Sequence, residues 1–417
     1  MNSSLRLLHT SDWHLGQYLM SRDRKREHER FLSWLLDCLR NQSIDVLLVC
    51  GDVFDTATPP NYALRLFFDF LHKISETPCR KVIILGGNHD SIATLHAPRK
   101  LLQLLDIHVV GGATARIEDE IVLVSGKEGE PAAIVCAVPF LRDRDLRHSV
   151  AGETYAEKSR ALLHGVRMHY RMVMEAAERL RAGLPGQFNH IPIIATGHLF
   201  VAGGLASDGV RELYVGSLGE IDSGSFPAFD YIALGHLHRA QTIKGRLHYS
   251  GSPIPLSFSE ADGVKQVKIV TFSPDSSAPQ ISALAVPSFQ KLGVVRGDIE
   301  QIRSRLAEIG ADGADDEKVW VEVQVTGESS VFDLQGAVSE AAEGLPVEIL
   351  AVRRVKGEAQ PGPGRGVVME SLNELLPRDV FARRLAMEKD LSAMDAEELA
   401  RTFHEALQIF HEGGEGL

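Results

Sequence analysis

The fold is decided by LRLLHTSDWH at residues 5–14 and VLLVCGDVFD at residues 46–55, because each joins a short apolar run to a cluster of polar residues. The same pattern returns in KVIILGGNHD at 81–90, IIATGH at 193–198 and YIALGHLH at 231–238. Near-continuous apolar runs of this length are typical of strands that are buried on both faces. The sequence therefore predicts sheet covered by helices, with a polar cluster directly after each of these strands.

Amphipathic helices are expected between the strands. From residue 23 to residue 40, Phe31, Leu35 and Leu39 recur at the i, i+4 spacing of one helix face, and residues 61–74 and 93–105 read similarly. The alternation of the two element types predicts a layered α/β domain over residues 1–275. Open α/β sheets place their sites at the carboxyl ends of strands, so the polar clusters should converge there.

The pattern of apolar and polar residues changes after residue 275, and a small α+β domain is predicted over residues 276–355. Its expected elements are a strand at 291–296, a helix at 299–309, a strand at 318–326, a helix at 331–343 and a strand at 346–353. Residues 356–366 are rich in Gly and Pro and predict a linker. In residues 367–417, two expected helices with apolar faces are too small to hold a core alone, so this tail should dock on something.

Composition limits the class of protein. The chain has 417 residues, of which 44% are hydrophobic and 24% charged, as in an ordinary globular protein. No apolar stretch approaches the ~20 residues of a membrane-spanning helix, and the polar start does not resemble a signal peptide, so a cytoplasmic protein without membrane contact is expected. The net charge of −12 would repel DNA, so any contact with DNA must be local, metal-assisted or shared with another chain.

Seven side chains of the polar clusters can hold metal ions: Asp12, His14, Asp52, Asn88, His198, His236 and His238. Two pairs are spaced i, i+2, which places both members on one side of extended backbone. Carboxylate and imidazole together suit manganese, iron, cobalt or zinc. The donors are too many for one four-coordinate ion, so two ions that share one carboxylate fit the count, and Asp52 is the candidate bridge.

The ordered motifs D-x-H, G-D-x-x-D, G-N-H-D, G-H and G-H-x-H resemble the calcineurin-like metallophosphoesterase superfamily, and the chain carries all five. The resemblance implies that Asp12, His14, Asp52 and His238 hold the first ion and that Asp52, Asn88, His198 and His236 hold the second. It also implies that His89 faces the substrate phosphate as general acid or transition-state stabiliser, with Asp90 orienting it. The implied reaction is in-line attack of water on a phosphodiester phosphorus. The role of Asp55 stays open.

Further stretches, including HTSDWHLGQ, GDVFDTATPP, YSGSPIPLSFSE and LPVEILAVRR, resemble the bacterial nuclease subunits of the double-strand-break repair nuclease family over nearly the whole chain. This resemblance implies a manganese-dependent 3'-to-5' exonuclease on double-stranded DNA ends that also cuts hairpins and single strands as an endonuclease, near the nucleoid. It implies a partner ATPase with long coiled coils, whose base the tail at 367–417 would grip, and a capping domain at 276–355.

The same resemblance implies a homodimer within a heterotetramer, with the helices at 61–74 and 93–105 as dimerisation elements. The chain has no G-x-x-x-x-G-K-[ST] phosphate loop, so ATP is expected to act through the partner. Residues near the motifs are candidates for phosphate contacts or base stacking: Arg22, Arg24, Lys25, Arg26, Arg239, Ser257, Phe258 and Ser259.

Two other functions share the motifs. A small-molecule phosphodiesterase or phosphatase of the same superfamily would use every metal ligand, although the α+β segment, the linker and the tail favour the nuclease. A catalytically silent scaffold for a repair ATPase is disfavoured, because unused buried carboxylates and imidazoles are costly to keep paired without metal.

Overall fold

The computed structural model describes residues 4–147, 152–205, 221–276, 278–311, 318–326 and 334–355, together with residues 381, 399, 402 and 403. The chain divides into two compact units. The first comprises Met1–Val295, Ser304–Glu322 and Ala342–Ala351, and the second comprises Arg296–Arg303, Val323–Ala341 and Val352–Leu417. All five motifs lie in the first unit.

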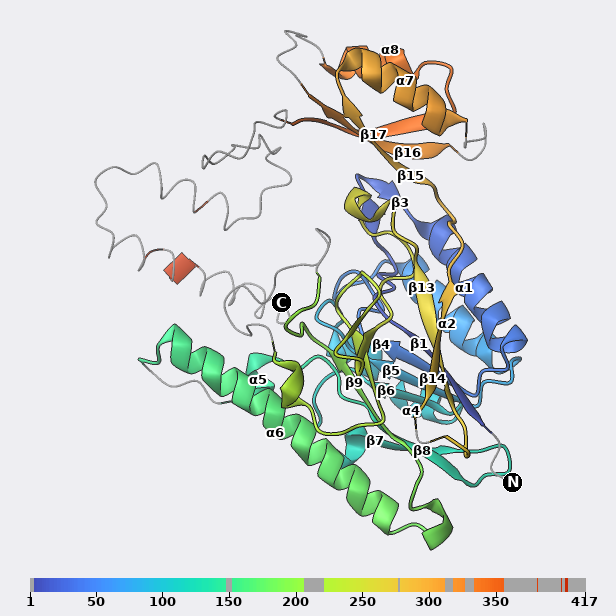
Figure 1. Ribbon diagram of the computed structural model, residues 1–417, viewed down its shortest axis with the longest axis vertical. Helices are drawn as coiled ribbons and strands as arrows, with labels where there is room; N and C mark the ends of the chain where they lie inside the picture. The colour runs from blue at the N-terminus through green and yellow to red at the C-terminus, as the bar shows by residue number, and fades with distance from the viewer. Residues whose placement is uncertain are drawn as a thin grey trace. The chain divides into compact units, whose positions relative to one another are not determined.

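Two six-stranded sheets form the body of the first unit (Figure 1). One has the order β14-β13-β1-β4-β5-β6, with bounds β1 Leu5–Thr10, β4 Val46–Cys50, β5 Lys81–Leu85, β6 Ile107–Val110, β13 Gln266–Phe272 and β14 Gln280–Ala285. The other has the order β11-β12-β10-β9-β8-β7, with bounds β7 Ile121–Ser125, β8 Pro131–Cys136, β9 Ile193–His198, β10 Tyr231–Gly235, β11 Gln241–Ile243 and β12 Leu247–Tyr249.

Each sheet contains four neighbouring strands that run parallel. In the first sheet β1, β4, β5 and β6 run in one direction, and in the second sheet β8, β9, β10 and β12 do so. Parallel strands have their carboxyl ends at one edge, and the polar motifs follow β1, β4, β5, β9 and β10 at that edge. The predicted layered α/β fold is confirmed, and the structure adds that it contains two sheets.

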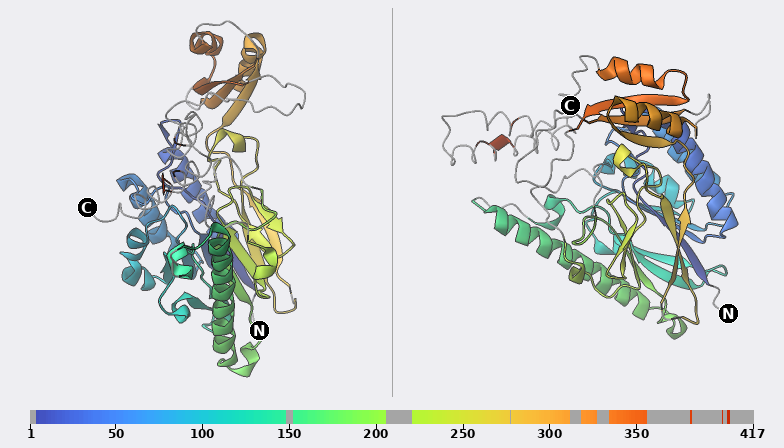
Figure 2. Two further views of the ribbon diagram at one scale, coloured as in Figure 1. Left: turned by 90° about the vertical axis from the view of Figure 1, so that its left-hand side faces the viewer. Right: turned by 45° about the horizontal axis from the view of Figure 1, so that its top comes forward.

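Each sheet is covered on both faces, which explains why the strands read as continuous apolar runs. The inner faces pack against each other through one buried cluster that includes Leu7 and Leu48 of the first sheet and Val135 and Ala233 of the second. The outer faces are covered by helices, α1 (Lys25–Asn41) and α2 (Asn61–Ile74) on one side and α6 (Tyr155–Ala182) on the other. The blue α1 and α2 and the green α6 accordingly lie on opposite sides of the strands in Figures 1 and 2.

Short elements complete the first unit: the hairpin β2 (Tyr18–Leu19) and β3 (Arg22–Asp23), and helices α3 (Ile92–His96), α4 (Arg99–Gln103) and α5 (Asp143–Leu146). The single helix predicted at 93–105 is wrong, because α3 and α4 are separate helices on either side of Pro98. Proline lacks the backbone N–H that a continuing helix needs, so the chain starts a new helix after it.

A three-stranded sheet of order β15-β16-β17 contains β15 (Leu292–Gly297), β16 (Val319–Val325) and β17 (Val347–Arg354), which alternate along the chain with α7 (Ile299–Gly310) and α8 (Leu334–Ala342). These elements have the predicted types and order. The first sheet extends beyond residue 275, because β14 pairs antiparallel with β13. The mostly exposed side chains of β14 carry no apolar pattern that would have predicted the strand.

The linker at 356–366 lies outside the described residues, as does most of the predicted tail. Phe381 and Phe403, which the sequence places on two apolar helix faces, stack with ring centroids 3.9 Å apart and planes at 6°. Among the described residues, no helix combines the length and the apolar character that a membrane span requires.

Candidate metal centre

The motifs of both sheets meet at the shared carboxyl edge. The backbone N–H of Asp12 donates to the Gly51 carbonyl at 3.0 Å, and the N–H of His14 donates to the Asp52 carbonyl at 3.0 Å. From the second sheet, the His236 N–H donates to Asp12 Oδ1 at 2.9 Å. These three bonds tie the ends of β1, β4 and β10 together, so the motif side chains point at one another.

The motif backbone is bent in an unusual way. Asp12, His14, Asp52 and His236 have φ angles of 54°, 46°, 49° and 94°. Positive φ is rare for residues other than glycine and costs on the order of 1–3 kcal/mol each where surrounding structure enforces it. Four strained residues in one place indicate that the turns are shaped to aim these side chains at a common centre.

Two motif glycines lie so close to ligand side chains that no larger residue would fit in their place. A Cβ atom on Gly51, whose φ is 86°, would lie 2.3 Å from His198 Nδ1, and a Cβ atom on Gly87 would lie 2.1 Å from Asp52 Oδ1. Both distances are far shorter than any contact a carbon atom can make. The G-D and G-N motifs therefore require glycine because of the ligand that packs beside it.

Asp52 lies in the middle of the cluster. Its Oδ2 atom is 3.2 Å from His198 Nε2 and 3.6 Å from His14 Nε2. On one side, ligand atoms of Asp12, His14 and His238 lie within 4.8 Å of one another. On the other side, Asn88 Oδ1 lies 2.9 Å from His198 Nε2 and 3.0 Å from His236 Nδ1. The seven predicted ligands thus form two groups with the Asp52 carboxylate between them.

The buried Asp52 carboxylate and the histidines around it shift one another's pKa values. Burial alone would raise the pKa of Asp52, but His198 and His89 outweigh burial and hold it well below its usual range. In return, the pKa of His198 rises to about 9 against the effect of burial, because Asp52 stabilises the imidazolium. Burial and the neighbouring His198 charge lower the pKa of His236 to about 3. The buried Asp52 carboxylate is thus stabilised by positive charge next to it.

The donor set fits divalent metal ions. His14 Nε2 is buried and makes no hydrogen bond, while the opposite ring atom Nδ1 lies 3.1 Å from Asp55 Oδ1. A buried polar atom without a hydrogen bond is costly, so its lone pair needs another partner. Carboxylate, amide oxygen and imidazole donors in this arrangement suit two borderline divalent ions, with Asp52 between them.

His89 lies beside the centre, and one of its ring nitrogens is within 4.8 Å of ligand atoms of His14 and Asp52. The expectation that Asp90 orients the His89 ring is wrong. The Asp90 carboxylate accepts backbone N–H bonds from Gly87, Val53 and Phe54 at 2.9, 3.1 and 2.9 Å, so it fastens two motif loops to each other. The His89 ring is held by Nδ1, which donates to the Asp55 carbonyl oxygen at 2.7 Å.

A buried network behind His238 was missed from the sequence. Glu260 Oε1 lies 3.3 Å from His238 Nδ1, and Lys265 Nζ donates to Glu260 Oε2 at 2.5 Å and to the His238 carbonyl at 3.1 Å. Burial would raise the pKa of Glu260, but His238 and Lys265 outweigh it and hold that pKa far below its usual range. A carboxylate on the far nitrogen of a ligand histidine fixes its ring and raises its basicity. The sequence signal was weak, a single Glu after the apolar run IPLSF.

Replacing Glu260 with Gln is expected to weaken Mn²⁺ binding by about 10- to 100-fold, the usual effect of losing such a partner. The measurement is a calorimetric titration of metal-free protein with Mn²⁺. Glu120→Gln is the matched control, because Glu120 is also a buried carboxylate beside a histidine and lies 2.7 Å from His169 on the outer side of the second sheet. Equal affinity in the Glu260 variant and the wild type would contradict a positioning role for Glu260.

The predicted DNA contacts divide into exposed and buried residues. Arg22, Lys25, Arg26 and Arg239 have exposed side chains, and Ser257 is partly exposed. Arg24 and Phe258 are wrong as DNA contacts, since they are 1% and 4% exposed. Arg24 instead pairs with Glu27 at 2.6 Å and donates to the Pro255 carbonyl at 2.5 Å, which holds α1 to the 255–260 loop.

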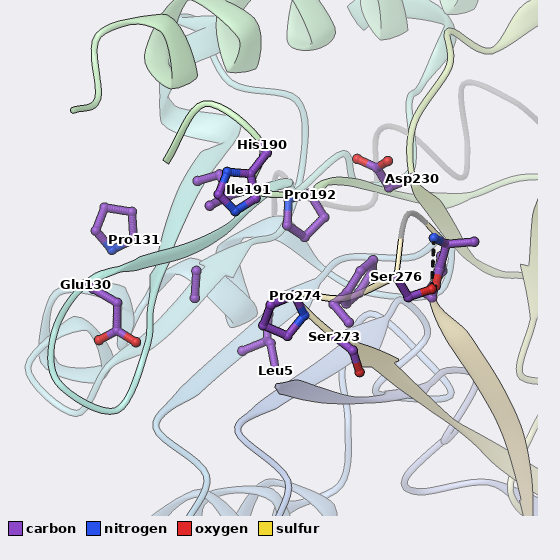
Figure 3. A pocket seen from close by; sticks show the side chains of 14 residues that line it. Leu5, Glu130, Pro131, His190, Ile191, Pro192, Asp230, Ser273, Pro274 and Ser276 are labelled. Atoms are coloured by element: carbon purple, nitrogen blue, oxygen red, sulfur yellow. Dashed lines mark hydrogen bonds between the residues drawn. The ribbon is translucent and has the colours of Figure 1, made fainter. Parts of the chain in front are cut away.

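Two cavities lie at different edges of the first unit. A polar cavity of 620 Å³ adjoins His238 and Arg239 and is lined by Ser250, Ser252 and Lys265 among others. A smaller cavity of 130 Å³, shown in Figure 3, is lined by Leu5, Pro131, Pro192 and Asp230. These residues stand at the amino ends of β1, β8, β9 and β10, so this cavity is at the edge opposite the motifs.

Comparison with known proteins agrees with this geometry. Residues 5–159 match the family model described as calcineurin-like phosphoesterase, and residues 288–405 match the one described as type 5 capsule protein repressor C-terminal domain. The SbcD subunit of the nuclease SbcCD from Escherichia coli strain K12 is 41% identical over 92% of this chain and 94% of its own length. The SbcD subunit from Rhodobacter capsulatus is 30% identical over 91% of this chain and 94% of its own length. The SbcD subunit from Bacillus subtilis is 36% identical over 66% of this chain and 68% of its own length.

Proposed function

The chain belongs to the SbcD family of nuclease subunits, and from this premise we propose that it hydrolyses DNA phosphodiester bonds at the centre around Asp52. We propose 3'-to-5' exonuclease action on double-stranded ends and endonuclease action on hairpins and single strands. The observation that carries the proposal is the position of the Asp52 carboxylate between two groups of metal donors, 3.2 Å from His198 and 3.6 Å from His14.

Two divalent ions, which we propose to be manganese, would be held by Asp12, His14, Asp52 and His238 on one side and by Asp52, Asn88, His198 and His236 on the other. When bound, such ions lower the pKa of water and neutralise charge on the phosphoryl oxygens. The residues of the chain supply the geometry. Asp52 keeps the two donor groups together, Glu260 fixes the His238 ring, and the Asp90 carboxylate holds the two loops that carry Asp52 and Asn88.

His89 is proposed to transfer or share a proton with the phosphate or the leaving oxygen. Because its Nδ1–H donates to the Asp55 carbonyl, Nε2 is the ring atom that would carry the exchanged proton. The backbone N–H of His89 also donates to Asp52 Oδ1 at 2.9 Å, so the ring is anchored to the carboxylate between the two donor groups. A side chain fixed at both its backbone and its ring suits general acid catalysis.

The substrate assignment is tested by one assay. Purified chain, with and without SbcC and ATP, is incubated in Mn²⁺ with labelled hairpin DNA and, separately, with bis-p-nitrophenyl phosphate. Cleavage of the hairpin supports the nuclease. Hydrolysis of the small diester while DNA stays intact in every mixture would favour the alternative, a small-molecule phosphodiesterase.

We propose SbcC as the ATPase partner and a homodimer of this chain within the heterotetramer, working at DNA ends in repair and recombination in the cytoplasm near the nucleoid. The dimer proposal is supported by α4 and the residues after it, where Leu101, Leu104 and Leu105 are 65%, 80% and 52% exposed. Adjacent exposed leucines of this kind mark protein interaction sites. The tail at 367–417 is proposed to bind the coiled-coil base of SbcC, and the segment 276–355 to cap the DNA.

Two matched variants separate these interfaces. Deleting residues 367–417 is expected to abolish co-purification with SbcC and to leave the sedimenting species a dimer, because the two surfaces are distinct. Leu104→Glu is expected to do the reverse, giving a monomer that still binds SbcC. Retained SbcC binding after the deletion would refute the tail assignment, and a dimeric Leu104 variant would refute the α4 assignment.

A further inference from the structure

Helix α6 has a basic stripe on its exposed face. Arg160, His164, Arg167 and Arg171 are all exposed and follow the spacing i, i+4, i+7, i+11, which places them in one row along the helix. The opposite face of the helix, with Tyr170 and Val173, packs into the core on the second sheet. The whole helix has six Lys and Arg against three Glu, in a chain whose net charge is −12. The stripe is thus a local basic surface on an acidic protein.

The arginines of the stripe differ from the other basic residues nearby. Arg179 and Lys158 of the same helix lie 3.9 Å from Glu118 and 3.1 Å from Asp143, and Arg147 is bridged to Asp143 and Glu153. Among the residues that the structure describes, Arg160, Arg167 and Arg171 form no ion pair with a carboxylate. Arg160 donates to the Ala156 carbonyl and Arg167 donates to Ser225 Oγ, both neutral acceptors. Glu157 and Asp222 lie close enough to Arg160 and Arg167 to interact with them electrostatically, but no ion pair joins them, so these guanidinium groups remain able to bind phosphate.

The stripe begins at the edge of the sheets that carries the motifs. The segment after β8 leaves the carboxyl end of that strand, where the Phe140 ring lies 6.2 Å from the ring of His198. It continues through Arg142, which donates to the Asp90 carbonyl at 3.4 Å, into α5 and then α6. Leu146 of α5 packs so closely on α6 that a Cβ on Gly165 would meet it at 2.9 Å. The first half of α6 is thereby tied to the edge of the active site.

Building on the proposed nuclease function, we propose that the α6 stripe binds the phosphate backbone of the DNA duplex that extends from the cleavage site. At 1.5 Å per residue the row from Arg160 to Arg171 is about 16 Å long. This length matches the backbone of about five base pairs at 3.4 Å per step. Guanidinium groups pair with phosphate oxygens in a bidentate manner, and contacts of this kind position DNA without reading its sequence.

The test compares the triple variant Arg160→Gln, Arg167→Gln, Arg171→Gln with a control of equal charge loss, Lys73→Gln, Lys127→Gln, Arg179→Gln, whose three side chains are also exposed. Binding of a phosphorothioate duplex to the full chain in Mn²⁺ is measured over a range of salt concentrations. Each lost phosphate contact removes about 0.9 from the slope of log K against log salt. The stripe variant is therefore expected to lose about 2 to 3 from the slope and to bind more weakly, while the control keeps the slope of the wild type.

Hydrolysis of bis-p-nitrophenyl phosphate should be equal in all three proteins, since a small diester does not reach the stripe. Hairpin cleavage by the wild type reports separately on the nuclease function. If the wild type cleaves DNA but the stripe variant keeps its salt slope and affinity, the stripe proposal is overturned and the nuclease stands. If the slope of log K against log salt decreases by the same amount in both triple variants, the effect is one of net charge and the proposal is also overturned.

Discussion

Asp52→Asn is expected to reduce the rate of DNA cleavage by about 10²- to 10³-fold, the scale on which one essential electrostatic group contributes to an active site. The physical reason is the position of Oδ2 between His14 Nε2 and His198 Nε2, where an amide would present either a neutral oxygen or an N–H. Asparagine keeps an oxygen that can accept the His89 backbone N–H, so the fold should be retained. The measurement is single-turnover cleavage of hairpin DNA in Mn²⁺, with the circular dichroism spectrum as the check on folding.

Asp55→Asn is the matched comparison, since the Asp55 carboxylate lies 3.1 Å from Nδ1 of His14, the ring atom opposite the one that faces Asp52. It is expected to cost about 10- to 100-fold, as the loss of a partner behind a ligand usually does. A folded Asp52 variant that cleaved DNA at the wild-type rate would remove Asp52 from the chemistry. An Asp55 variant as inactive as the Asp52 variant would contradict the proposal that Asp52 contributes more to the cleavage rate than Asp55 does.

His89→Gln is expected to lower the cleavage rate by about 10²- to 10⁴-fold, the range that a positioned acid or base contributes. Mn²⁺ affinity should remain close to that of the wild type, because His89 is not among the proposed ligands and its ring is held by the Asp55 carbonyl. The combination of slow cleavage and intact metal binding separates a catalytic role from a ligand role. Calorimetric titration with Mn²⁺ and the hairpin assay on the same preparation give the two quantities.

His72→Gln serves as the control for His89, because His72 is an exposed histidine near the end of α2. The His72 variant should have the cleavage rate and the Mn²⁺ affinity of the wild type. Loss of Mn²⁺ binding in the His89 variant would make His89 a ligand, and unaltered cleavage would leave it without a catalytic role.

The sequence was sufficient to predict that the ligand residues directly after strands lie close together. Asp12, Asp52, Asn88, His198 and His236 each come at or just after the carboxyl end of a buried parallel strand, so strand order alone brings them together. The number of sheets could not be read in this way. An apolar run is the same whether the second face of a strand meets a helix or another sheet, and only the pairing of distant strands separates the two cases.

Residues held by distant segments were the ones that the sequence misjudged. Arg24 belongs to the run RDRKRE, which reads as a solvated helix face, and its burial depends on Glu27 and on the Pro255 carbonyl from a distant loop. Glu260 was overlooked for the same reason, since its role depends on His238 and Lys265 meeting it in space. The break at Pro98 was local and could have been predicted, because proline interrupts the hydrogen bonding of a helix.

Anomalous diffraction from crystals of the full chain grown with Mn²⁺ is the most direct test of the proposed centre. Two anomalous peaks are expected on either side of the Asp52 carboxylate, one beside Asp12, His14 and His238 and the other beside Asn88, His198 and His236. A single peak, or two peaks that do not share Asp52, would contradict the proposed centre.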